Sequence, residues 1–486
     1  MRSGRYLFAL FLLLSSAAAQ TPPGWVKISG PAEAWTGQPD GLAGDRSNSY
    51  AWSMDILDDG LYVGTNRNIF GMMVAMAGIP WPPAVPVPEQ PDPGPGIYRM
   101  DLKTRQWSIV HRSPLDVGYR MMKSFGGGSG PAVLYAGSAA FQSCRLLAVE
   151  RSGRVTPVFQ SPQRPAIASI RAITEHDGRL YWAADTAGQP GIWHSHDPLG
   201  DHRAGRPHSR LPDPSPQIIP ARAEVADMVS AFGWLYVFYI AHNPAPGPPS
   251  APFLEGFWSI KGRWAGNRWI WQPVAGNGPA ALYPPGIDSH RNGAAVPFRF
   301  KEHVYVGTLD GNTFRMMTGL GGSMPGPVGG SLPAETIINI MGGRHGMRIY
   351  RFDAKDRYEP VMPSPRPSGA GDAAAEGFGN PLNKYIWRFG EQNGTLWAGT
   401  FDISTGVDVL TGNSFADPAV RGFDLCSSRD GTRWMCETRN GFDDPFNYGV
   451  RSFVSDARGG ALYMGTANPF FGCQIWMRRP GNAARQ

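Results

Sequence analysis

The chain has 486 residues, a formal net charge of +6 and 42% hydrophobic residues, enough apolar material for a large core. Its 62 glycines and 46 prolines favour many turns without making the chain low-complexity. Lysine and arginine do not alternate with aromatic residues along one face, so the mild positive charge gives no support for a nucleic-acid partner. With an aromatic content of 12%, the composition predicts an all-β protein.

The first nineteen residues have the pattern of a signal peptide. Arg2 and Arg5 form a positive start, residues 6–14 form a short apolar run, and Ala17-Ala18-Ala19 offers a cleavage site. The apolar run is too short to span a bilayer, and no later stretch is long enough to do so. We therefore expect a secreted protein, extracellular or periplasmic, with residues 1–19 removed and no integral membrane segment.

One short motif recurs along the chain. It consists of an aliphatic residue, an aromatic residue and then small residues, as in LYVGT. The copies begin at Leu61, Leu134, Leu180, Leu235, Val304, Leu396 and Leu462. Their uneven spacing excludes a strict solenoid but fits a repeat that carries loop insertions.

Around each copy we predict four antiparallel strands. The first is an apolar run such as residues 385–389, and a tight turn such as Asn393-Gly394 joins it to the second strand, which holds the motif. Third strands are predicted at residues 96–100, 144–149, 191–195, 256–260, 347–352, 422–426 and 473–477. Fourth strands are predicted at residues 107–111, 155–159, 269–274, 358–362 and 434–438, with none placed in the third repeat.

Seven repeats of four strands predict a single seven-bladed β-propeller over residues 20–477, followed by a polar, basic tail at residues 478–486. The last repeat lacks a fourth strand of its own. Residues 25–28 (WVKI) would supply it by pairing with residues 474–477, closing the ring and covering two strand edges. The alternative is that Trp25 begins an irregular arm.

The connections of such a ring fall on two faces. Long insertions join second strands to third strands, at residues 66–95, 240–255, 310–346 and 402–421. The loops that lead into first strands, such as residues 377–383 (GFGNPLN) and 441–447 (GFDDPFN), lie on the same face. Long irregular loops on a rigid scaffold commonly carry function. We expect the site on this insertion-bearing face.

Residues 428–434 (SRDGTRW) resemble the Asp-box of sialidases and related propellers, S-x-D-x-G-x-x-W, with one residue missing because Asp430 and Gly431 are adjacent. The resemblance implies a structural turn and no activity, and no arginine motif of the sialidase kind precedes the first repeat. The style of the repeats, down to LYMGTANPFFGCQIW at the end of the chain, is similar to that of secreted propellers without a known activity.

Two sets of residues are candidates for ligand binding. The first is a set of amides and indoles that would line the channel mouth, unless the asparagines only form turns: Asn48, Asn383, Asn447, Trp52 and Trp387. The second is a set of arginines on or next to first strands: Arg120, Arg171, Arg388 and Arg451. Arginines there suit bidentate capture of a carboxylate or sulfate. The alternative is that they pair with acidic residues of a neighbouring blade.

Three residues are candidates for catalysis. Asp310 and Asp402 directly follow second strands, and His290 lies on the connection into the fifth repeat. The two aspartates could act as acid and base or bind Ca²⁺, or they could cap the start of the following loop. No known catalytic or nucleotide-binding motif occurs in its required context. We predict no cofactor and no metal site.

The four cysteines fit an oxidising compartment. Cys426 and Cys436 flank a tight turn and would lie opposite each other on two strands, so we predict a disulfide between them. Cys144 and Cys473 fall in different repeats and are expected to be buried thiols.

The sequence thus predicts a monomeric binding scaffold for a polar ligand such as a saccharide, because aromatic rings stack on sugars while amides and guanidinium groups bind their edges. One alternative is an extracellular lyase or glycoside hydrolase that acts on an acidic substrate at the channel mouth. Another is a protein-interaction propeller that uses the proline-rich loop at residues 81–95.

Overall fold

The fold was analysed on a computed structural model of the chain. It describes residues 24–30, 42–69, 71, 91–127, 130–163, 167–186, 189–220, 223–242, 254–311, 313, 345–363, 375–411 and 418–480. The predicted signal peptide, residues 81–90 of the proline-rich loop and the tail beyond residue 480 lie outside these ranges. No helix within them is long and apolar enough to cross a membrane.

The described chain is almost all β-strand, and consecutive strands pair antiparallel in groups of up to four. The groups are β2 to β5 (Asn48–Leu57, Gly60–Arg67, Gly96–Asp101, Trp107–Arg112), β6 to β9 (Asp116–Phe125, Val133–Phe141, Arg145–Val149, Val155–Gln160), β10 to β13 (Ile167–His176, Arg179–Thr186, Gln189–Ser195, Ser209–Arg210), β14 to β17 (Ala223–Ala231, Trp234–His242, Leu254–Ala265, Arg268–Ala275), β18 to β21 (Asn292–Phe300, His303–Asp310, Ile349–Phe352, Tyr358–Met362), β22 to β25 (Asn383–Gln392, Thr395–Asp402, Leu425–Ser428, Met435–Thr438) and β26 to β28 (Gly449–Ser455, Leu462–Ala467, Ile475–Arg478).

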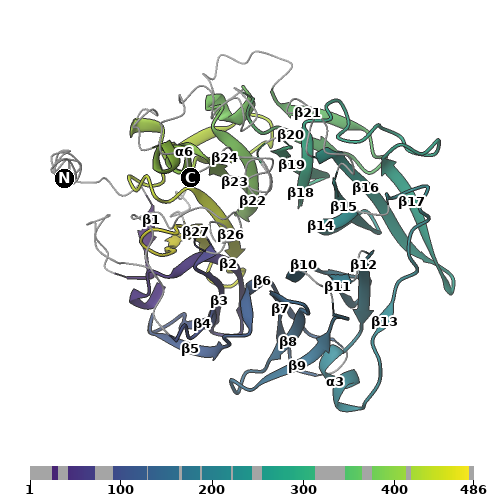
Figure 1. Cartoon of the computed structure of the whole chain (residues 1–486), viewed down its shortest axis with the longest axis horizontal. Helices are drawn as coiled ribbons and strands as arrows, with labels where there is room; N and C mark the ends of the chain where they lie inside the picture. The colour runs from purple at the N-terminus through teal and green to yellow at the C-terminus, as the bar shows by residue number, and fades with distance from the viewer. Residues whose placement is uncertain are drawn as a thin grey trace, which may run out of the picture.

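The groups stand around a common centre, as in a β-propeller, with the first strand of each group nearest the middle (Figure 1). We call these first strands the inner strands. Helical segments are short and lie in connections: α3 (Pro198–Arg203), α6 (Ser404–Thr411) and the 3-10 turns η1 (Leu42–Gly44), η3 (Glu376–Gly379) and η4 (Pro418–Val420).

The N-terminal strand β1 (Trp25–Lys27) pairs antiparallel with β28, near the other end of the chain. Trp25 lies opposite Arg478 and Val26 opposite Met477, and the Ile28 N–H donates to the Ile475 carbonyl at 2.8 Å. A second link joins the same ends, because Tyr50 of β2 pairs with Ala467 of β27.

The glycine of the repeated motif lets neighbouring groups approach each other. A Cβ added at Gly399 of β23 would lie 2.3 Å from the Cβ of Val450 on β26. The equivalent Gly307 meets Ile386 of the next inner strand in the same way. Any side chain at this position would therefore push two groups apart.

The threonine of the motif fixes the next strand of its own group. The Thr400 hydroxyl accepts a hydrogen bond from the Asp424 N–H at 2.8 Å, just before β24. Thr308 accepts from Arg348 and Thr466 from Gln474, each at 2.9 Å. The glycine of the motif thus allows close contact between two groups, and the threonine forms a hydrogen bond within its own group.

The predicted strands agree with the structure to within a few residues, and the missing fourth strand of the third repeat is β13, only two residues long. Cys426 and Cys436 are opposite partners on β24 and β25 and form a disulfide. In the Asp-box-like turn, Asp430 accepts hydrogen bonds from the N–H groups of Thr432 and Arg433, and Trp434 is buried.

Candidate functional site

Six inner strands carry an irregularity of the β-bulge kind at a corresponding place. The pairing between the first and second strand of the group skips one residue there: Trp52 in β2, Arg120 in β6, Arg171 in β10, Ala226 in β14, Trp387 in β22 and Arg451 in β26. A bulge leaves one residue unpaired and re-aims its side chain. We call this set the bulge ring; it holds five of the nine predicted ligand-binding residues.

Arginine and tryptophan side chains of the bulge ring stack from group to group. The Arg451 guanidinium carbon lies 5.0 Å from the ring centre of Trp387 and 5.8 Å from that of Trp52. The Arg120 guanidinium carbon also lies close to Trp52, at 5.2 Å from its ring centre. These distances are in the range of cation–π contacts, so the order around the ring is Trp387, Arg451, Trp52, Arg120.

Two glycines make room for the tryptophans. A Cβ added at Gly449 in β26 would lie 2.1 Å from the Trp387 ring, and one at Gly118 in β6 would lie 2.4 Å from the Trp52 ring. Each indole therefore lies against the start of the next inner strand, where only glycine leaves the space.

Two arginines of the second predicted set form ion pairs. Arg388, which directly follows Trp387, reaches Asp227 of β14 at 2.7 Å and the Met121 sulfur of β6 at 3.2 Å. Arg171 reaches Glu224 at 3.3 Å. Because β6, β14 and β22 belong to different groups, Arg388 extends across the centre of the ring. Burial raises the pKa of Asp227, and the nearby Arg388 opposes the shift.

Arg451 has a different environment. It is 5% exposed, and among the described residues its Nε has no hydrogen-bond partner. Burial, together with the positive charges of Arg388 and Arg171, lowers the pKa of Arg451 from 12.5 to about 9. The bulge ring thus contains a buried cation that stacks on two indole rings and lies in a positive environment.

Tyrosines lie next to the stack. Tyr50 and Tyr448 precede Trp52 and Arg451 in the chain, and their hydroxyls contact each other. Burial raises the pKa of Tyr50 to about 12. Both rings lie within 6 Å of the Trp387 ring centre, at 5.7 and 5.8 Å. Tyr50, Tyr448 and Trp387 thus form one aromatic cluster beside the stack.

The predicted channel-mouth asparagines instead hold their own loops together. Asn48, Asn383 and Asn447 have no exposed surface. Each donates to the carbonyl six residues earlier, at Leu42, Gly377 and Gly441, and Asn292 does the same to Gly286. These amides belong to the turns that lead into the inner strands and are not presented to a ligand.

Asp402 and Asp310 have different partners. Asp402 is fully buried, accepts hydrogen bonds from the Ser404 N–H at 2.8 Å and from Asn380 at 3.0 Å, and so caps the start of α6. Asp310 forms ion pairs with Arg291 at 3.2 Å and with the buried Lys384 at 3.6 Å. Burial lowers the pKa of Lys384 to about 8, and Asp310 opposes that shift.

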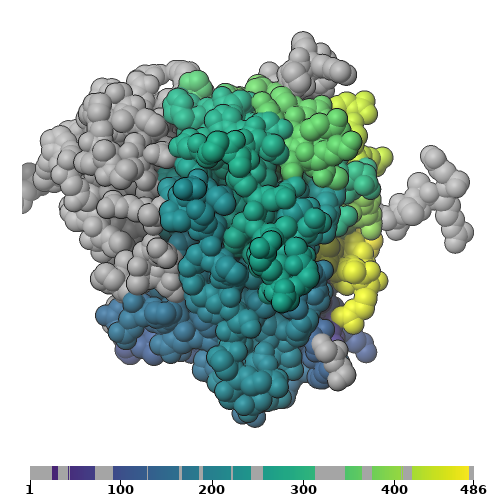
Figure 2. Space-filling model, turned by 90° about the vertical axis from the view of Figure 1, so that its right-hand side faces the viewer, coloured from purple at the N-terminus to yellow at the C-terminus, as the bar shows by residue number. Residues whose placement is uncertain are grey.

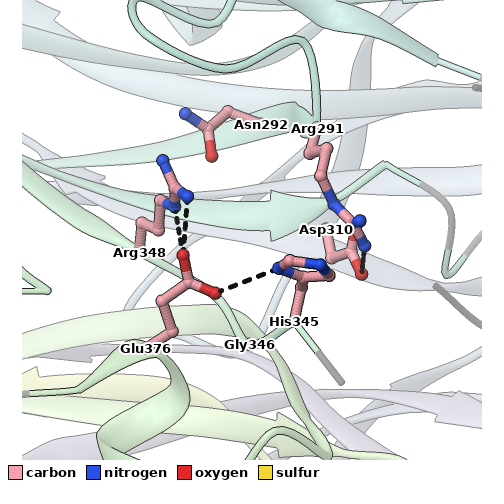
Figure 3. Close-up of a pocket in the computed structure, with 7 residues that line it drawn as sticks. All are labelled: Arg291, Asn292, Asp310, His345, Gly346, Arg348 and Glu376. Carbon is pink, nitrogen blue, oxygen red and sulfur yellow. Dashed lines mark hydrogen bonds and ion pairs between the residues drawn. The ribbon is translucent and has the colours of Figure 1, made fainter. Parts of the chain in front are cut away.

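A small pocket lies at the base of the insertion at residues 310–346 (Figure 3). It is lined by Arg291, Asn292, Asp310, His345, Gly346, Arg348 and Glu376. Glu376 is held by Arg348 at 2.6 Å and lies 3.6 Å from His345. His290 is exposed and does not line the pocket. Single charged residues in irregular loops, such as Glu376 and Arg348, carry no sequence signal that would have identified them.

The bulge ring and this pocket share no residues. The partners found for Arg171, Arg388 and Arg451 are Glu224, Asp227, Met121 and the two indoles, whereas Asp310 pairs with Arg291 and Lys384. The predicted arginines and Asp310 are therefore parts of two separate arrangements in the described chain, while His290 and Asp402 line neither.

No protein-family model matches the chain, and neither does any curated protein. Solved structures that it resembles include the GH74 xyloglucanase from Xanthomonas campestris, at 13% identity and a TM-score of 0.47 over 95% of this chain and 54% of that one. This chain thus spans about half the length of the xyloglucanase.

Two further likenesses cover both chains almost fully. One is to the mitotic checkpoint complex, at 11% identity and a TM-score of 0.43 over 96% of this chain and 98% of that one. The other is to the Penicillium chrysogenum α-L-arabinanase complexed with arabinobiose, at 11% identity and a TM-score of 0.37 over 94% and 98%.

Proposed function

We propose that the chain forms a seven-bladed propeller closed by its N-terminal strand. The pairing of β1 with β28 supplies a fourth strand to the last group, and the Tyr50–Ala467 pair links that group to the first. We also propose that residues 1–19 direct secretion. The disulfide between Cys426 and Cys436 supports this, since disulfides persist in oxidising compartments.

We propose that this propeller binds a polar, saccharide-like ligand at the bulge ring, from the insertion-bearing face. The observation that carries the proposal is the stack of Trp387, Arg451, Trp52 and Arg120. Indole rings offer flat apolar surfaces for sugar rings, and guanidinium and tyrosine hydroxyl groups offer hydrogen bonds to sugar edges. Gly118 and Gly449 leave the space that the two indole rings occupy.

Titration calorimetry with neutral and acidic oligosaccharides tests this site. Trp387 is half-buried, and replacing it by alanine should weaken binding by about tenfold, the equivalent of about 1.4 kcal/mol. Trp271→Ala is the matched control, because Trp271 is a half-buried indole on the outer strand β17. Equal affinities for the wild type and the Trp387→Ala variant would exclude the bulge ring as the binding site.

The pocket in Figure 3 favours a second candidate, an extracellular lyase or glycoside hydrolase acting on an acidic substrate. His345 lies beside Glu376, which Arg348 holds, and Arg291 adds a second guanidinium group. A histidine next to a fixed carboxylate suits general acid–base chemistry. Release of products from acidic polysaccharides by the wild type but not by His345→Ala would support this function, and no release by either protein would exclude it.

A further inference from the structure

Three arginines at or next to the bulge ring, Arg171, Arg388 and Arg451, differ in their acidic partners. The two ion pairs there, Arg171 with Glu224 and Arg388 with Asp227, use one carboxylate for each arginine. Arg451 is more buried than either of these arginines, and its contacts are the indole rings of Trp52 and Trp387. No carboxylate of the described residues forms an ion pair with it. Asp227, which Arg388 already holds, attracts Arg451 without contacting it.

A buried cation without a counter-ion is costly, because burial removes its hydration and nothing of opposite charge replaces it. Two features make the cost higher for Arg451. Arg388 and Arg171 repel it, and its Nε lacks a hydrogen-bond partner among the described residues. Contacts with two indole rings return only part of the lost hydration free energy. Such an arrangement is explained if a bound ligand supplies the missing negative charge.

Resting on the proposed binding function, we infer that the ligand of the bulge ring is an acidic saccharide whose oxyanion group, a carboxylate or a sulfate, binds Arg451. The guanidinium fork matches the geometry of both groups. Arg171 and Arg388 contribute positive potential, while Trp52 and Trp387 form apolar walls on either side. A neutral sugar would leave the Arg451 charge uncompensated.

The test uses the full chain and three short oligosaccharides of equal length, one neutral, one carboxylated and one sulfated. We expect at least one acidic probe to bind about tenfold or more tightly than the neutral one, with an affinity that falls as salt is raised. The acidic probe that binds more tightly shows whether Arg451 binds a carboxylate or a sulfate. Arg451→Met should remove the preference, because it should weaken binding of the preferred acidic probe by about tenfold or more and binding of the neutral sugar by much less. Arg263→Met is the control. The Arg263 guanidinium carbon lies 4.1 Å from the ring centre of Trp234, and neither residue belongs to the bulge ring.

The melting temperature without ligand provides a second measurement. If Arg451 is there for a ligand, Arg451→Met removes an uncompensated buried charge and should raise the melting temperature. If Arg451 is only a structural contact, the same change should lower it, and an unfolded variant would likewise overturn the inference.

Failure of the inference differs from failure of the proposed function. Equal binding of neutral and acidic probes, weakened by Trp387→Ala but not by Arg451→Met, would keep the binding site and overturn its anion specificity. Binding of none of the three probes would overturn both.

Discussion

At the level of single residues, Asp402 couples stability to pH. Its carboxyl is fully buried, and burial raises its pKa from 3.8 to about 7, against the hydrogen bonds from Ser404 and Asn380. Between these two values the folded chain holds a proton that the unfolded chain releases. The stability contributed by the protonated group is therefore fully present below about pH 4 and is lost as the pH rises through about 7.

The expected result for Asp402→Asn is a flatter pH profile of stability. One pKa unit corresponds to about 1.4 kcal/mol, so the wild type should lose up to about 4 kcal/mol of unfolding free energy from this group between about pH 4 and pH 8. Urea unfolding at several pH values measures the slope. Burial also raises the pKa of Asp424; Arg439 opposes the shift and the Asp402 carboxyl adds to it. An unchanged slope in Asp402→Asn would contradict the assignment.

Five residues of the bulge ring are candidates from the sequence alone, but the sequence does not show how they meet. Arg171 and Arg451 are predicted from their places on or next to first strands, and Trp52 and Trp387 as indoles at the channel mouth. A bulge brings their side chains to one level, and no local pattern of residues marks a bulge. For Asn383 the sequence allowed both a turn and a ligand contact. The structure shows that Asn383 has no exposed surface, so it belongs to the turn and does not contact a ligand.

At the level of strands, the packing between neighbouring groups should depend on the glycine of the repeated motif, which contacts the next inner strand. The backbone of Gly399 is one that alanine can adopt, so the effect of Gly399→Ala comes from its 2.3 Å approach to Val450. We expect a loss of about 1–3 kcal/mol of unfolding free energy, as is typical of overpacking. Chemical denaturation of Gly399→Ala measures it. Gly406→Ala is the comparison: nothing lies within 4 Å of its added Cβ, and because Gly406 lies in α6 the change should leave stability unchanged or raise it by up to about 1 kcal/mol.

Combining Gly399→Ala with Val450→Ala tests the contact itself. The smaller side chain at residue 450 makes room for the added methyl group. The double variant should therefore be more stable than the sum of the single effects predicts, by at least about 0.5 kcal/mol. Strict additivity would mean that the two groups do not touch at this point.

Strands were predictable because most of them repeat one chemical pattern. Five of the seven copies, all except those at Leu180 and Leu235, pair a buried aliphatic and aromatic residue with the glycine and threonine (or serine) that contact their neighbours. Several turns contain glycine at positive φ, as at Gly394. The two-residue β13 was missed because it is too short to show a pattern and follows helix α3 in a long connection. Pocket residues such as Glu376 lie in loops where spacing carries no information.

At the level of the whole molecule, the ends of the chain hold the last group together. Trp25 is 2% exposed, packs edge-on against Trp397 at 5.6 Å and donates its indole N–H to Glu437 at 2.9 Å. It thus joins the N-terminus to β23 and β25 as well as to β28. Removing it should affect two neighbouring groups rather than one strand edge.

We expect Trp25→Ala to lower the free energy of unfolding by about 3–5 kcal/mol, the usual cost of truncating a buried aromatic residue. The loss should come with new protease cleavage near residues 25–28 and 475–478, since unpairing β1 exposes the edge of β28. Thermal unfolding and limited proteolysis measure the two effects. Trp271→Ala removes a half-buried indole on the outer strand β17 that contacts neither β1 nor β28, so it should lower stability less and leave both ends protected. Equal losses in the two variants, with no cleavage at the C-terminal strand, would mean that β1 does not close the ring.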